Sequence, residues 1–186
     1  MNNYSVNLNL PFNPLKDGYV FPTERYQNLI ELDVVNEDFL KFIESLSLKV
    51  VRGVIFYSQP GEITPIHADG DGSDLIKMLW RWGGDLSIMN WYKPRDDIQK
   101  DISYNFGKLD HVRYVPDEVE MIHQQKIGFP SICQVGIPHN VTNYDEYRWV
   151  LCLVIVDPAI TQGKRTLGFD KSLDIFKDYI TDEIIV

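Results

Sequence analysis

The stretch SICQVGIPHNVTNYDEYRWVLCLVIVD, residues 131–157, decides the fold. It holds two apolar runs rich in Val, Ile and Cys, a composition typical of β-strands. A short polar connection separates the runs, which predicts a β-hairpin centred on Asn143 and Tyr144. In that hairpin His139 and Arg148 would be cross-strand partners, and opposed residues point to the same face of a sheet. The pattern therefore predicts an imidazole and a guanidinium side by side.

The same strand-like texture extends back to Val50, with runs such as VVRGVIFYSQ, LIKMLWRW and LSIMNWYKP. Helical patterns flank it. One begins after the N-cap residue Asn36, and a second begins after Asp170 near the end of the chain. We therefore expect one mainly β domain with flanking helices. Its parts would be a helical lead-in over 1–49, a β core over 50–157 and a C-terminal helix within 158–186.

The composition excludes some classes of partner. The chain has 27 Asp and Glu against 18 Lys and Arg and no evident basic patch, so neither nucleic acid nor an anionic membrane is an expected partner. The N-terminus lacks a secretory pattern and no apolar run is long enough to span a bilayer, which predicts a soluble cytoplasmic protein. Cys133 and Cys152 lie in apolar runs, where buried free thiols are expected.

Two histidines lie in settings suited to chemistry. His67 precedes Asp69 by two positions, and residues two apart in a strand project to the same face. Alone, this spacing is weak because it is common by chance. His139 and the nearby Arg148 strengthen it, because an arginine that faces a sheet interior needs an anion. That anion is either a bound ligand or a local carboxylate from residues 145–146.

Two imidazoles and one carboxylate on one face leave three coordination positions open, as non-haem iron(II) oxygenases require. Zinc accepts the same ligands. Hydrolytic zinc sites, however, need a general base and do not need an arginine close to the last histidine. Arg148 is therefore the residue that favours iron.

The set His67-Ala68-Asp69, His139 and Arg148 resembles the motif of the iron(II)- and 2-oxoglutarate-dependent dioxygenases, in particular small, prolyl hydroxylase-like members. The resemblance implies a double-stranded β-helix, or jelly roll, as in cupins. It implies an oxidoreductase in which His67, Asp69 and His139 bind Fe(II) while Arg148 grips the far carboxylate of 2-oxoglutarate. Such an enzyme would hydroxylate a C–H bond of its substrate and release succinate and carbon dioxide.

The resemblance also implies that the Tyr57 hydroxyl and Asn90 contribute to the cosubstrate pocket. One departure concerns the position two residues after the arginine, where many members have a hydroxyl and this chain has Val150. Two alternatives therefore stay open: a cupin-like domain that binds or isomerises a small molecule, and a catalytically silent relative that acts as an interaction protein. The substrate would be a small molecule or a peptide. The segment 94–116 would be an insertion near the cavity mouth, either a specificity loop or a solvated connector.

Overall fold

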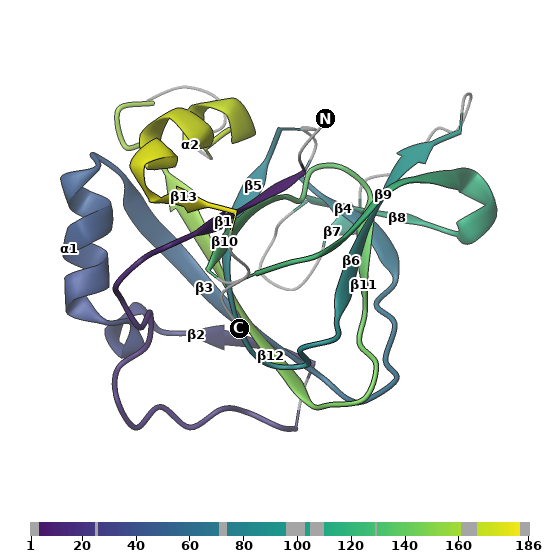
Figure 1. Cartoon of the computed structure of the whole chain (residues 1–186), viewed down its shortest axis with the longest axis horizontal. Helices are drawn as coiled ribbons and strands as arrows, with labels where there is room; N and C mark the ends of the chain where they lie inside the picture. The colour runs from purple at the N-terminus through teal and green to yellow at the C-terminus, as the bar shows by residue number, and fades with distance from the viewer. Residues whose placement is uncertain are drawn as a thin grey trace.

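Two antiparallel sheets form the body of the protein (Figure 1). The computed structural model describes residues 4–24, 26–70, 74–95, 103–104, 110–128, 130–160 and 167–182. The larger sheet consists, in order, of β13 (Ile180–Thr181), β1 (Ser5–Leu8), β10 (Ser131–Gln134), β5 (Ile76–Gly83), β12 (Arg148–Val156), β3 (Lys49–Ser58) and β2 (Gln27–Ile30). The smaller sheet consists, in order, of β7 (Ser103–Tyr104), β8 (Asp110–Tyr114), β4 (Ile66–Asp69), β11 (His139–Thr142), β6 (Ile88–Pro94) and β9 (Val119–Lys126).

The strand order identifies the core as a jelly roll. Along the chain β3, β4, β5 and β6 alternate between the sheets, β9 stays beside β6, and β10, β11 and β12 alternate again. The larger sheet thus contains β10-β5-β12-β3 and the smaller one β4-β11-β6-β9 as neighbours. Two four-stranded halves built in this way form the double-stranded β-helix. The mainly β fold class predicted from the sequence is confirmed.

Strand β12 explains why its sequence is almost continuously apolar. It lies between β5 and β3 in the larger sheet, and it is covered on both faces. Leu151, Leu153 and Ile155 belong to the main core between this sheet and the helices, whereas Val150 and Cys152 face the smaller sheet. Strands buried on both faces lose the alternation of polar and apolar residues.

The predicted hairpin between residues 139 and 148 is wrong. Strand β11 pairs with β4 and β6 in the smaller sheet, while β12 pairs with β3 and β5 in the larger one. The connection crosses between the sheets and is organised by Asn143, whose side-chain amide donates to the carbonyls of Gln59 and Glu146. A short polar connection has the same composition in both topologies, so the sequence could not distinguish them.

Both helices pack on the outer face of the larger sheet (Figure 1). Helix α1 spans Glu37–Ser45, and the Asn36 side chain accepts a hydrogen bond from the Asp38 N–H, as its predicted N-cap role requires. Helix α2 spans Phe169–Phe176 and its N-cap is Gly168, so the predicted start at Asp170 was two residues late. Short 3₁₀ helices occupy Leu32–Val34, Pro116–Glu118 and Lys177–Tyr179.

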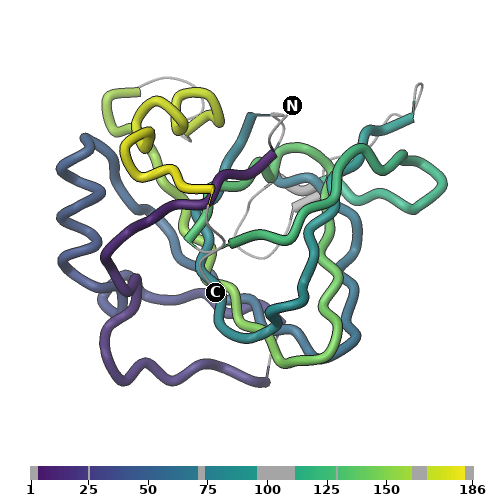
Figure 2. The backbone as a smooth tube through the Cα atoms, viewed as in Figure 1, coloured from purple at the N-terminus to yellow at the C-terminus, as the bar shows by residue number. Residues whose placement is uncertain are grey.

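The lead-in over 1–49 is less helical than predicted. Within its described residues α1 is the one α-helix, and the segment before it, whose path is the purple tube in Figure 2, also contributes strands β1 and β2. These strands extend the larger sheet by pairing with β10 and β3, and such pairing cannot be read from isolated four-residue segments. Cys133 and Cys152 are buried and free, as expected. In the described part of the chain, no helix is both long and apolar enough to cross a membrane.

Candidate metal centre

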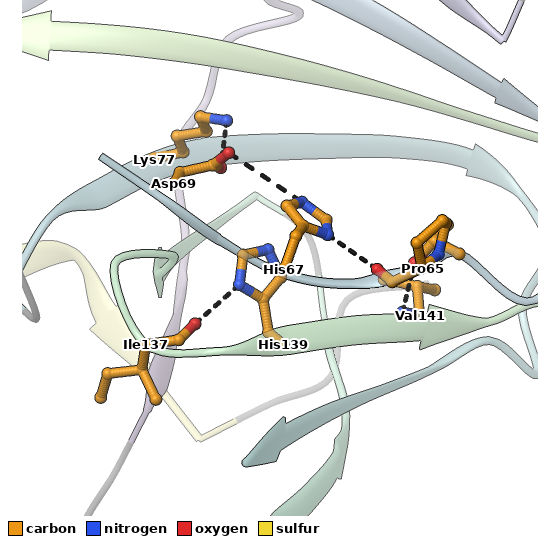
Figure 3. Close-up of polar contacts among 8 residues, drawn as sticks. Pro65, His67, Asp69, Lys77, Ile137, His139 and Val141 are labelled. Carbon is orange, nitrogen blue, oxygen red and sulfur yellow. Dashed lines mark hydrogen bonds and ion pairs between the residues drawn. The ribbon is translucent and has the colours of Figure 1, made fainter. Parts of the chain in front are cut away.

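Two histidines face each other across neighbouring strands of the smaller sheet (Figure 3). His67 on β4 is the register partner of His139 on β11, and the centroids of the two rings lie 4.4 Å apart. Asp69 follows two residues after His67 and therefore points to the same side. The ligating atoms of these three residues all lie within 4.8 Å of one another. The structure thus brings together the three ligands predicted from the sequence.

The same local hydrogen bond orients both imidazoles. Nδ1 of His67 donates to the carbonyl of Pro65, and Nδ1 of His139 donates to the carbonyl of Ile137, each at 2.8 Å (Figure 3). A carbonyl oxygen only accepts, so the proton is on Nδ1 and the Nε2 lone pair is left for a metal ion. Burial, together with His67, lowers the pKa of His139 to about 3. The His139 ring is therefore neutral at pH 7, as a metal ligand must be.

The spacing of these atoms fits a divalent ion. Nε2 of His67 lies 3.9 Å from Oδ1 of Asp69. Two adjacent ligand atoms of an ion bound at about 2.1 Å are about 3 Å apart. The two side chains would therefore have to approach each other by about 1 Å for both atoms to bind one ion. Three ligands on one side leave the opposite side of the ion open.

Asp69 also carries a buried counter-ion. Nζ of Lys77 on β5 donates to Oδ2 of Asp69, and both side chains are 12% exposed. Burial lowers the pKa of Lys77, but the adjacent carboxylate of Asp69 outweighs this and raises the pKa above its usual value. Lys77 is therefore a cation paired with one of the three candidate ligands.

A second buried cation, Arg148, lies at the start of β12. Its residue exposure is 7%, and its Nε has no hydrogen-bond partner. Among the described residues it forms no ion pair. Two carboxylates close to it in the fold are engaged elsewhere: Glu146 accepts from the N–H of Gly84, and Asp85 pairs with Arg81. Burial lowers the pKa of Arg148 to about 10. The local carboxylate considered from the sequence is therefore not its partner.

A glycine makes room for the Arg148 side chain. Gly84 has a φ of +63°, and a Cβ at this position would lie 2.8 Å from Cβ of Arg148 and 2.9 Å from its Cδ. Real Cβ contacts are not that short, so a larger residue would push the arginine aside. The absence of a side chain at Gly84 therefore allows Arg148 to lie in this position.

The inner faces of the two sheets enclose one cavity that holds both features. His67, Asp69, His139, Lys77 and Arg148 all line it. The rest of its wall is mainly apolar, with Phe56, Leu79, Ile88, Met89, Ile127, Val135, Val141, Val150 and Cys152, and hydroxyls come from Tyr26, Thr64 and Ser87. Among the described residues of this wall, Asp69 is the one carboxylate.

The structure does not bring Tyr57 or Asn90 to this cavity. On β3, Phe56 faces the cavity and Tyr57 points to the opposite side, where it contacts Tyr147 and Trp149. On β6, Met89 faces the cavity, and Asn90 on the other side donates to the side chain of Asn140. The cavity roles predicted for Tyr57 and Asn90 are wrong because side chains alternate between the two faces of a strand, and both residues point away from the cavity.

Two cavity residues were missed at the sequence level. Lys77 had a usable signal, since it is a charged residue inside the apolar run LIKMLW. Tyr26 had none, because it precedes the four-residue strand β2 and reaches the cavity through tertiary packing. About half of the predicted insertion 94–116, namely residues 96–102 and 105–109, lies outside the described residues. Its described parts form β7, β8 and the short turn before β9, and β8 pairs with β4.

No family model and no curated protein matches this chain. Some solved structures align with part of it. An oxalate decarboxylase aligns with a TM-score of 0.29 and 12% identity over 58% of this chain and 24% of its own length. The apo form of HygX from Streptomyces hygroscopicus aligns with a TM-score of 0.29 and 8% identity over 57% of each chain. The capsular polysaccharide assembling protein CapF from Staphylococcus aureus aligns with a TM-score of 0.29 and 13% identity over 65% of this chain and 31% of its own.

This chain therefore spans between 24% and 57% of the length of those three proteins. Such low scores indicate a partial likeness only. The fold assignment rests on the strand order, and the candidate site rests on the His-Asp-His cluster and the cavity around it.

Proposed function

We propose that this protein is an iron(II)- and 2-oxoglutarate-dependent dioxygenase that hydroxylates a C–H bond of its substrate. One observation carries the proposal: Arg148 is buried without an anionic partner among the described residues, and it faces the same cavity as the His-Asp-His cluster. Taking an unpaired charge out of water is unfavourable, so a buried cation of this kind is expected to meet a ligand anion. A dicarboxylic cosubstrate that also chelates the metal supplies such an anion.

Different residues of the site would bind the metal ion and the cosubstrate. His67, Asp69 and His139 would hold the ion through two neutral nitrogens and one carboxylate oxygen. Iron bound there would supply oxygen activation, with 2-oxoglutarate converted to succinate and carbon dioxide. Arg148 binds the far carboxylate of the cosubstrate through its planar guanidinium, which suits two parallel hydrogen bonds.

Tyr26 replaces the hydroxyl that is absent at Val150. Both residues line the cavity, and Tyr26 is the group that most opposes the effect of burial on the pKa of Arg148. The hydroxyl of Thr64 accepts from Val141 N–H, and that of Ser87 donates to Asn143. Thr64 thus keeps a hydroxyl hydrogen to donate, but Tyr26 is the hydroxyl that we assign to a carboxylate bound at Arg148, because it is the group that interacts most strongly with this arginine.

The apolar wall has a protective role. Leu79, Met89 and Val135 are buried and belong to the cluster that surrounds the cavity. An apolar enclosure keeps water from the metal and strengthens the contact between guanidinium and carboxylate.

The test is an anaerobic titration with iron(II) and then 2-oxoglutarate. Bidentate chelation of iron(II) by a 2-oxo acid produces a visible charge-transfer band, which we expect in the wild type and not in His67→Ala. Arg148→Met should need far more 2-oxoglutarate to reach the same band. Admitting air should then release succinate from the wild type. Folded wild-type protein that gives no band at saturating additions contradicts the proposal.

A second candidate is favoured by the ion pair between Lys77 and Asp69. This carboxylate already has a buried counter-ion, which suits a cupin-like domain that binds a small molecule without a metal. In that case His67→Ala leaves ligand binding intact, and iron(II) does not stabilise the protein against heat. The titration above separates the two candidates.

A further inference from the structure

Two basic side chains and one carboxylate line the cavity. Lys77 and Arg148 line it from neighbouring strands of the larger sheet, and Asp69 is the one carboxylate among its described lining residues. A further positive charge, Arg52, is near enough to lower the pKa of Lys77. The cavity therefore has an excess of positive charge even before a metal ion enters.

The two cations lie at different levels of the cavity. Arg148 is the register partner of Gly83 on β5, and Lys77 lies six residues before Gly83 on the same strand. At about 3.3 Å per residue, this separates the two backbone positions by about 20 Å. Lys77 reaches Asp69, whereas the side chain of Arg148 packs against Gly84 near the other end. One carboxylate cannot contact both cations.

Metal binding changes the charge around Lys77. Asp69 is the present partner of Lys77, and a single carboxylate cannot neutralise both an ammonium group and a divalent ion. Asp69 and a dianionic cosubstrate together carry three negative charges, which offset the divalent ion and Arg148. Lys77 then lacks an anion of its own, and its side chain is only 12% exposed, so an unbalanced cation there is unfavourable.

We propose, on the basis of the function proposed above, that Lys77 is a specificity-determining residue that binds a carboxylate of the primary substrate. The substrate would then be a small organic acid whose acid group sits beside Asp69 and holds the rest of the molecule over the metal. The ammonium of Lys77 has three donor hydrogens, so it can contact Asp69 and a substrate carboxylate together.

The experiment uses full-length protein loaded anaerobically with iron(II) and 2-oxoglutarate, which cannot turn over without oxygen. The probes are matched pairs, acetate with acetamide and benzoate with benzamide. Their binding is read from the melting temperature and from the change in the charge-transfer band. The variants are Lys77→Met, which removes the charge, Lys77→Gln, which keeps a hydrogen-bond donor, and Lys77→Arg, which keeps the charge.

We expect the wild type to bind each carboxylate more tightly than its amide. Lys77→Met and Lys77→Gln should weaken carboxylate binding by about tenfold or more, since each removes a charge-assisted hydrogen bond. Both variants should keep the charge-transfer band, and Lys77→Arg should retain part of the preference. If Lys77→Met fails to fold, Lys77→Gln gives the same comparison.

Two results would overturn the inference. One is a wild type that binds carboxylates no better than amides. The other is loss of the band in folded Lys77→Gln, which would mean that Lys77 serves the metal or the cosubstrate instead. Failure of the proposed function has a different signature, because the wild type then gives no band before any probe is added.

Discussion

Replacing Arg148 by methionine should stabilise the metal-free protein and weaken cosubstrate binding. Burial lowers the pKa of Arg148 from 12.5 to about 10. One pKa unit corresponds to about 1.4 kcal/mol, so burying this unpaired charge costs roughly 3 kcal/mol. Methionine has no charge and fits an apolar wall. We therefore expect Arg148→Met to raise the free energy of unfolding by about 1–3 kcal/mol in urea with a chelator present.

Binding should change in the opposite direction. A guanidinium that holds a carboxylate through two charge-assisted hydrogen bonds contributes about 3–6 kcal/mol, so the affinity for 2-oxoglutarate should fall by about a hundredfold or more. Isothermal titration of the manganese(II)-loaded protein measures this without turnover. The two opposite effects together identify a residue kept for a ligand.

Arg81 provides a matched control on the neighbouring strand. It pairs with Asp85 at 2.9 Å and donates to the Gly84 carbonyl at 2.8 Å. Arg81→Met should therefore destabilise the fold and change 2-oxoglutarate affinity far less than Arg148→Met does. Arg148 is not a ligand-binding residue if Arg148→Met destabilises the metal-free protein by more than about 2 kcal/mol, as loss of an internal partner would do, and binds 2-oxoglutarate as the wild type does.

Three further changes have defined outcomes. Gly84→Ala should displace Arg148 and weaken 2-oxoglutarate binding in a titration, whereas Gly61→Ala, also at positive φ but in open space, should only lower stability by about 1 kcal/mol. His139 has a folded pKa of about 3 against 6.5 unfolded, so its contribution to stability is complete above pH 6.5 and is lost as the pH falls. Urea unfolding of metal-free protein should show about 2 kcal/mol less stability from this group at pH 5 than at pH 8, and a His139→Gln variant that keeps the full loss would contradict this. Asn36→Ala should remove about 1 kcal/mol of stability by loss of the N-cap, with no change in metal affinity measured by titration.

The sequence allowed the candidate metal ligands to be predicted because their geometry is partly local. His67 and Asp69 are two residues apart on one strand, and this spacing alone sets their common direction. Their meeting with His139 depended on which strands pair. The predicted hairpin put His139 beside Arg148 for a reason that the structure contradicts, since the two residues lie in different sheets. They share a cavity because the inner faces of the two sheets oppose each other.

The residues that line the cavity could not be predicted one by one, because both faces of the strands are buried. On β3, Ile55 packs in the main core and Phe56 faces the cavity, so hydrophobicity does not show which face is inside. The Tyr57 side chain was therefore assigned to the wrong face of β3. Lys77 was overlooked although a lysine in an apolar strand needs an anion, and its partner Asp69 was already among the predicted ligands.

The most direct test of the central claim is a crystal structure of the protein grown with manganese(II) and 2-oxoglutarate. We expect one ion bound by Nε2 of His67, Nε2 of His139 and a carboxylate oxygen of Asp69, with the 2-oxo acid end of the cosubstrate on the ion and its far carboxylate on Arg148. An ion bound elsewhere, or a cosubstrate whose far carboxylate does not meet Arg148, would contradict it.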